Sequence, residues 1–342
     1  MMRLLNILAR MMRGRILNIM QLSNLIKILF ILSFTTSFLI LYFLYPGSYE
    51  RTWKGRMYYL FFIWLISLEL ALNWKRIDVK VQRIISKRFI ALAIVMLLPI
   101  TYILIANFSG LNMLIMELSP KHYGLDWWSI FMPLTIEYLV FTVLSPLMVI
   151  LAYGTSGLRY FILPITLIGV VGLIFLIDNL YPFGEFTPFQ IIVPSAAILA
   201  SNLLTLLGYR TKLEGQIYGT PVLRVQGEKG EASFGVAWPC SGIDSLIIYS
   251  IITILFLRDE AATWKRKIAY FLIGAIITYF INILRITKIF ILAIEYGVAS
   301  LEVQRFHDHY GPLLSITWII TYQLIIIGVR SILRKKHVNK GL

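Results

Sequence analysis

The sequence is poor in charged residues and in cysteine. Only 14% of its 342 residues are charged and 58% are apolar, whereas soluble domains are about a quarter charged and about half apolar. The composition therefore excludes an ordinary soluble domain. A single cysteine, Cys240, leaves no second cysteine pair for a structural zinc site. The chain also lacks an internal repeat of the kind that builds solenoids.

What the sequence has instead is a series of long apolar runs. A helix of about 20 apolar residues crosses the hydrocarbon core of a bilayer. Such runs predict an all-α polytopic membrane protein, with candidate spans at 26–46, 56–73, 88–107, 130–153, 158–180, 188–208, 240–257, 268–290 and 312–331.

The net charge of +15 comes from basic residues that flank these runs, so it indicates membrane topology rather than nucleic-acid binding. Basic clusters in residues 3–27, 75–88, 265–267 and 330–340 predict that both termini face the cytoplasm. Termini on one side require an even number of crossings. We therefore expect about eight transmembrane helices, with either 130–153 or 188–208 failing to cross.

The longest segment outside the predicted spans is 209–239. In it "PVLRVQ" and "EASFGVAW" alternate apolar and polar residues around the turn "GEKG", which is typical of a β-hairpin. We expect this hairpin on the outer face, between N-terminal transmembrane helices (1–208) and a C-terminal transmembrane catalytic region (240–342). A hairpin edge of this kind can accept an extended peptide by strand addition.

Cys240 and Arg285 are predicted to lie at the same outer level of the membrane. Cys240 begins an apolar segment, where the positive end of a helix dipole favours a thiolate. Arg285 lies about 25 Å along the helix that rises from the cytoplasmic "WKRK". An arginine in an apolar run is expected to face a polar cavity. Asn282 and Lys288, three residues away on either side, are predicted to form a polar stripe with it.

The next outer loop, "EVQRFHDHYGPLL", adds His307, Asp308 and His309 at that level. A cysteine nucleophile needs a base or cation nearby, an arginine stabilises an oxyanion, and a histidine carries protons. The sequence thus predicts a site for acyl transfer. Each residue alone has a simpler interpretation: Cys240 as a small apolar residue, Arg285 as a snorkelling cation, and the histidines as solvated loop residues.

These residues give the chain a resemblance to a known family. "PCSGIDSL", "NILRI" at 282–286 and "HDHYG" at 307–311 are similar to motifs of the exosortase and archaeosortase family of membrane transpeptidases. The order also fits, with roughly 45 residues from cysteine to arginine and roughly 20 more to histidine. The resemblance covers residues 210–331 well.

The resemblance implies a sortase-like cysteine protease and transpeptidase in the cell membrane, with its active site at the outer face. Cys240 would be the nucleophile, Arg285 would stabilise the thiolate or oxyanion, and His307 would be the acid and base, with His309 as the competitor. Substrates would be surface proteins with a C-terminal sorting signal, and the acceptor would be an amine, plausibly on a membrane lipid. No metal or organic cofactor is implied.

Two residues of the cysteine motif carry separate expectations. Ser241 follows the cysteine as a small residue that keeps the sulfur accessible. Asp244 would oppose thiolate formation if its carboxylate faced the site. We expect it instead to pair with a cation such as Lys288 or Arg285.

Three other functions remain open from the residues alone. A transporter or channel would use Arg285, Asn282, Lys288 and Glu137 along a substrate path, and would show inverted repeats. A structural membrane subunit would tolerate loss of the cysteine. A serine protease would use Ser241 with His307, although no GxSG-type motif is present.

Overall fold

The structure is a computed structural model that describes residues 2–44, 46–81, 86–121, 126–182, 185–238, 240–258 and 262–340. Pro239 of the cysteine motif and residues 82–85 of the predicted cytoplasmic loop lie outside these ranges. The chain divides into two units, Met1–Leu173 and Ile174–Leu342.

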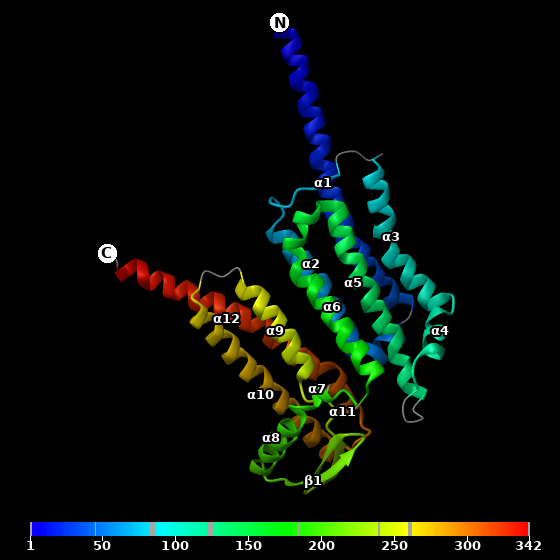
Figure 1. Cartoon of the computed structure of the whole chain (residues 1–342), viewed down its shortest axis with the longest axis vertical. Helices are drawn as coiled ribbons and strands as arrows, with labels where there is room; N and C mark the ends of the chain where they lie inside the picture. Colours follow the sequence, from blue (N-terminus) through cyan, green and yellow to red (C-terminus); the bar gives the residue numbers. More distant parts are fainter. Residues whose placement is uncertain are drawn as a thin grey trace. The chain divides into compact units, whose positions relative to one another are not determined.

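The first unit is helical. It contains α1 (Met2–Leu44), α2 (Gly47–Leu72), α3 (Lys87–Phe108), α4 (Leu111–Leu118), η1 (Asp126–Phe131), α5 (Met132–Tyr153), η2 (Thr155–Gly157) and the first part of α6 (Leu158–Leu180). Helices α1, α2, α3 and α5 lie side by side (Figure 1). The ring of Phe34 lies edge-on to those of Phe62 and Phe141, at 5.1 and 5.8 Å between centroids. Interlocked aromatic rings therefore hold α1, α2 and α5 together.

One buried ion pair joins two helices of this unit. Arg56 Nη1 of α2 donates to Glu137 Oε1 of α5 at 2.8 Å, and each residue is 5% exposed. A carboxylate inside a bundle is costly unless it is paired and hydrogen-bonded. Glu137 therefore has a structural partner in Arg56. Pro146, a second polar or helix-breaking feature of the 130–153 segment, does not end α5, which continues to Tyr153.

Seven helices in the described part of the chain are long and apolar enough to cross a membrane. They are Met20–Leu44, Lys87–Phe108, Ser129–Tyr153, Thr155–Leu180, Pro188–Leu206, Trp264–Tyr296 and Leu301–Ile332. The described apolar stretch of α2, Tyr58–Leu72, and helix α9 are shorter. The polytopic helical fold is thus confirmed, while the number of eight crossings stays a prediction.

The second unit combines helices with a small sheet. Its helices are α7 (Thr187–Gln190), α8 (Val193–Leu206), α9 (Ile243–Arg258), α10 (Trp264–Tyr296), α11 (Leu301–Arg305), the π-helix η3 (Phe306–Tyr310) and α12 (Gly311–Lys340). Helices α9, α10 and α12 lie side by side (Figure 1). Gly274 of α10 permits this packing, because a Cβ atom there would overlap Tyr249 of α9 and Tyr322 of α12.

The predicted hairpin is present, and a third strand extends it. The order is β1 (Arg210–Ile217), β2 (Thr220–Gly227) and β3 (Gly230–Gly235), all antiparallel. The alternation in β1 was harder to recognise from the sequence, because a bulge between Leu213 and Gln216 breaks its register.

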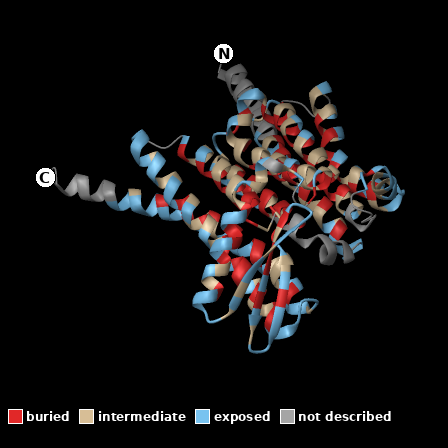
Figure 2. Ribbon diagram, turned by 60° about the horizontal axis from the view of Figure 1, so that its bottom comes forward, coloured by how far each residue is buried: buried red, intermediate tan, exposed pale blue. Residues whose placement is uncertain are grey.

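One face of the sheet is apolar and the other is charged. The buried positions of the sheet, red in Figure 2, include Leu223, Val225 and Ala232. Strands β2 and β3 contact α10. On this side Phe234 of β3 meets Phe290 of α10 at 5.0 Å between ring centroids. On the opposite face Arg224 bonds to Glu231 at 2.6 Å. The sheet is thus anchored on α8 and α10, and its last strand is positioned beside α10.

Candidate active site

The cysteine lies in a tight turn between the sheet and a helix. Its amide donates to Ala237 O at 2.9 Å, and the amide of Ser241 donates to the same carbonyl at 3.0 Å. Helix α9 begins only at Ile243, because Gly242 has φ +89°, a value that does not continue a helix. Cys240 therefore precedes the first turn of the helix rather than lying within it, and its side chain is partly exposed.

Helix α10 contacts this turn through the side chain of Asn282. The side-chain amide Nδ2 of Asn282 donates to Cys240 O at 3.1 Å, and Asn282 is fully buried. Gly242 makes the approach feasible, because a Cβ atom there would overlap the Asn282 amide group. Glycine at position 242 thus has a steric reason, because the turn lies directly against Asn282 of α10.

His307 contacts the side chain of the cysteine. Its Nε2 lies 3.7 Å from Cys240 Sγ, and its Nδ1 lies 2.7 Å from Asp308 Oδ1. Because a carboxylate only accepts, Nδ1 carries the proton in this pair, and Nε2 of the neutral ring is left as the basic nitrogen facing the sulfur. Cysteine, histidine and aspartate therefore form a continuous chain of polar contacts.

A π-helix places His307 and Asp308. The segment Phe306–Tyr310 forms one π turn between α11 and α12. A wider turn inserts an extra residue into the helix and changes the direction of the side chains around it, and such turns are frequent at functional sites. In this turn His307 is directed at the thiol of Cys240, and the next residue, Asp308, is directed at the imidazole of His307.

Arg285 is buried next to this turn. It is 2% exposed, and its Nε and Nη2 are buried atoms that have no hydrogen-bond partner among the described residues. A Cβ atom at Gly311 would lie 2.6 Å from Arg285 Nε and 3.1 Å from Phe306 O. Gly311 thus lets the arginine pack against the turn that carries His307. A buried guanidinium with unused donors can bind an oxygen atom, but Arg285 is not among the residues that line the pocket of Cys240 and His307.

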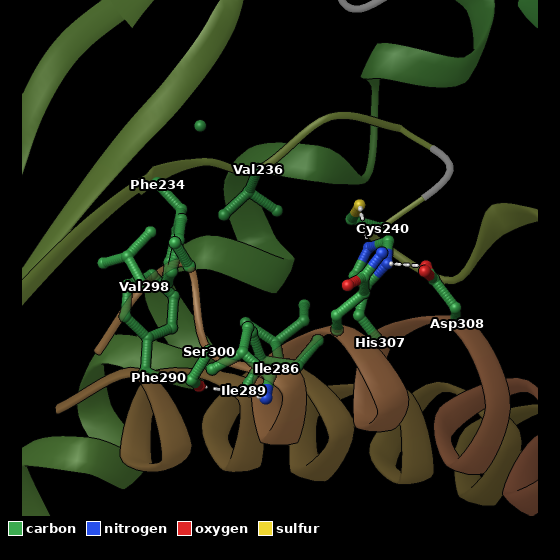
Figure 3. Close-up of a pocket in the computed structure, with 14 residues that line it drawn as sticks. Phe234, Val236, Cys240, Ile286, Ile289, Phe290, Val298, Ser300, His307 and Asp308 are labelled. Atoms are coloured by element: carbon green, nitrogen blue, oxygen red, sulfur yellow. Dashed lines mark hydrogen bonds and ion pairs between the residues drawn. The ribbon is translucent and has the colours of Figure 1, made fainter. Parts of the chain in front are cut away.

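Figure 3 shows the pocket into which Cys240 and His307 project. Its volume is about 440 Å³, within the range of roughly 300–1,000 Å³ that is usual for ligand sites. One end holds Cys240, His307 and Asp308, and the rest is mostly apolar, with walls from the end of β3, from α10 and from the loop before α11. The ionisable side chains Cys240, His307 and Asp308 therefore lie together at the sulfur end, while the other polar residues of the lining, Ser300 and Gln304, are uncharged.

The remaining predicted residues lie in different surroundings. Ser241 is fully buried, and its hydroxyl donates to Trp238 O at 2.8 Å. Asp244 is 4% exposed, and its Oδ1 accepts from the Ser245 amide at 2.8 Å. His309 is partly exposed. The predicted polar stripe is not uniform, since Asn282 and Arg285 are buried but Lys288 is exposed.

Two features were not given a role from the sequence. In the sequence Asp308 stands between two histidines, and a carboxylate beside a candidate base is the signal that can identify a positioning residue. Phe234 and Phe290, whose rings meet at 5.0 Å in the pocket wall, belong to segments about 56 residues apart in the chain. No local pattern connects them.

The fold and the site together define a class: a multi-pass helical membrane protein with a thiol–imidazole pair in a pocket. A family model described as transmembrane exosortase matches residues 52–323, which include every residue of the site, and the chain belongs to this family. The family predicted from the motifs is thus confirmed. Membership implies a sortase-like membrane transpeptidase and surface-protein substrates that carry sorting signals. No curated protein and no solved structure matches the chain.

Proposed function

We propose that this protein is a cysteine transpeptidase that cleaves surface proteins at a C-terminal sorting signal through a thioester on Cys240. The acyl group then passes to an amine acceptor, with a membrane lipid as the acceptor class. The observation that carries the proposal is the 3.7 Å separation of Cys240 Sγ and His307 Nε2 at the end of a pocket.

The first step is attack on the peptide carbonyl. The Cys240 thiol gives its proton to His307 Nε2, and the sulfur attacks the carbonyl carbon of the scissile bond. A tetrahedral intermediate forms, with negative charge on the former carbonyl oxygen. The turn between β3 and α9 supports the sulfur rigidly, because Asn282 holds the carbonyl of the same residue.

Arg285 is the group that we assign to the oxyanion. Its Nε and Nη2 are buried and have no hydrogen-bond partner among the described residues, and Gly311 leaves room for the guanidinium beside the turn that carries His307. Arg285 is not among the residues that line the pocket, so its guanidinium has to turn towards the bound peptide to reach the oxyanion. A donor that reaches an oxyanion contributes about 10²–10³-fold to the rate.

His307 completes both halves of the reaction. As an imidazolium it protonates the leaving amine, so that the C–N bond breaks and the thioester remains on the sulfur. It then removes a proton from the incoming amine, which attacks the thioester and expels the thiolate. Asp308 acts as a positioning residue, since its hydrogen bond to Nδ1 keeps Nε2 directed at the sulfur. The same bond favours His307 over His309 as the base.

We further assign the site to the outer face of the membrane, with both termini in the cytoplasm. The support is the position of the basic clusters, which are excluded from translocated loops. A membrane-impermeant maleimide is expected to label Cys240 in intact cells. Labelling only after permeabilisation would contradict the assignment.

The proposal is tested by trapping the acyl-enzyme. Membranes with the full chain are incubated with sorting-signal peptides and analysed by mass spectrometry for a hydroxylamine-sensitive adduct on Cys240. The wild type and Ser241→Ala are expected to form it, because the Ser241 hydroxyl is bound to Trp238 O. Cys240→Ala is expected to form none. An adduct on Ser241, or none with any signal class, would refute the thioester mechanism.

A further inference from the structure

Among the residues that the structure describes, no strand pairs with the outer edge of the strand that leads to the cysteine. β3 is the outermost strand of the sheet, so only one of its sides pairs with β2. The amide of Val236 donates to Pro221 O at 2.8 Å, and in this register Gly235 lies opposite Val222. Because hydrogen-bonded and non-bonded pairs alternate along an antiparallel ladder, the N–H and C=O groups of Gly235 and Ser233 point away from β2.

This edge continues into the pocket that contains the thiol. Phe234, Gly235 and Val236 all line the pocket, and Cys240 lines its other end. Figure 3 shows Phe234 and Val236 projecting from the strand towards the cavity that Cys240 and His307 also border. A peptide bound along β3 would therefore reach Cys240 Sγ while remaining inside the pocket.

The walls of the pocket restrict what side chain can enter. Beyond the sulfur end the lining carries no charged side chain and is mostly apolar, with Ile286, Ile289 and Phe290 from α10 and Val298 from the following loop; its polar residues there are Ser300 and Gln304. A charged side chain placed there would lose its hydration without gaining an ionic partner from this wall. An uncharged, apolar side chain would be stabilised by the surface that it buries.

From this geometry we infer that the sorting segment of the substrate binds as an added strand on the edge of β3. Its backbone bonds to Gly235 and Ser233, and one apolar side chain next to the scissile bond occupies the wall of Ile286, Ile289, Phe290 and Val298. The inference rests on the proposed thioester chemistry. Main-chain bonds supply affinity in this mode, and the side-chain pocket supplies specificity.

A backbone scan of the peptide tests the strand. A synthetic peptide that forms the Cys240 thioester with the wild-type protein is N-methylated at one amide at a time. Methylation at alternate amides is expected to raise the peptide concentration for half-maximal thioester formation by about five- to tenfold, the worth of one lost hydrogen bond. The amides between them should be tolerated. A uniform effect along the peptide would overturn the added strand.

A variant of the strand supplies a second readout. Ser233→Pro removes the outward N–H while leaving the bonds to β2, since proline is tolerated on the open side of an edge strand. We expect the same five- to tenfold loss. Leu213→Pro on β1 is the matched control, because Leu213 occupies the equivalent outward position on the opposite edge of the sheet. Equal effects of the two proline variants would contradict the inference.

The apolar wall is tested by a change of preference. Val298→Glu places a carboxylate in the wall, so that a peptide with lysine at the pocket position should gain at least tenfold relative to one with leucine. Leu301→Glu is the control, since Leu301 is 62% exposed and is not part of the lining. An unchanged preference in Val298→Glu would refute the side-chain assignment. Absence of the thioester in the wild type would instead defeat the proposed function, so the two failures are distinguishable.

Discussion

Replacing Gly311 by alanine adds a single methyl group at the point where Arg285 packs against the turn of His307. That carbon would lie 2.6 Å from Arg285 Nε, 2.8 Å from Arg285 Cδ and 3.1 Å from Phe306 O. The first two contacts are shorter than any that real side chains tolerate, and they involve the middle of the arginine rather than its flexible end. Either the guanidinium or the π turn has to move.

The size of the effect follows from the overlap. Relieving contacts of 2.6 and 2.8 Å to an ordinary separation needs a shift of roughly 0.6–0.8 Å at this site. Arg285 is 2% exposed, so a displaced guanidinium moves against packed protein atoms rather than into bulk solvent. A misplacement near 1 Å lowers the rate of an oriented reaction by about 10²-fold, which corresponds to about 2.7 kcal/mol in the activation free energy.

The assay is the first-order rate of thioester formation on Cys240 at saturating peptide, with thermal unfolding in detergent measured in parallel. Gly328→Ala is the matched control, because it lies on the same helix and nothing comes within 4 Å of its added carbon. We expect Gly328→Ala to react at the wild-type rate. A Gly311→Ala protein that is folded and reacts as fast as Gly328→Ala would refute the role given to Arg285 and its packing.

Three further outcomes are expected. Asp308→Asn should slow thioester formation by about 10²-fold, since His307 loses the carboxylate that holds its tautomer, and a wild-type rate would contradict this. Asn282→Ala should slow the same step about tenfold, because it removes one hydrogen bond to the backbone of the nucleophile; an effect on peptide affinity alone would argue against a positioning role. Glu137→Ala should lower the free energy of unfolding by about 3–5 kcal/mol by removing the carboxylate that neutralises the buried Arg56, whereas exchanging both residues for methionine should restore most of it, as thermal unfolding will show.

Much of the fold could be predicted because its determinants are local. The apolar runs and their basic flanks specify membrane helices residue by residue, and the turn "GEKG" between alternating segments specifies the β2–β3 hairpin. Strand β1 could not be predicted in this way, since its bulge interrupts the alternation and the strand is formed by pairing with β2. The first residue of α9 could not be predicted either, because the positive φ of Gly242 places the start of the helix at Ile243 rather than at Cys240.

For the candidate site, too, the residue types could be recognised from the sequence but their contacts could not. Cys240, Arg285 and His307 stand out in the sequence as reactive or charged residues beside apolar segments, and their order is enough to indicate the transmembrane exosortase family. The resemblance places Cys240 and His307 ahead of Ser241 and His309, but no local pattern gives the contacts that support this proposal. These contacts are His307 Nε2 at 3.7 Å from the sulfur and the Ser241 hydroxyl bonded to Trp238 O.

The sequence by itself determined that this protein is a multi-pass helical membrane protein of the exosortase family, because hydropathy, charge placement and short motifs are properties of neighbouring residues. Only the tertiary structure decided that Asn282 supports the cysteine turn, that Gly311 admits Arg285, and that the edge of β3 opens into the pocket of the thiol. These contacts join residues from separate elements. They depend on the distances that packing sets, and side-chain packing acts through space rather than along the chain.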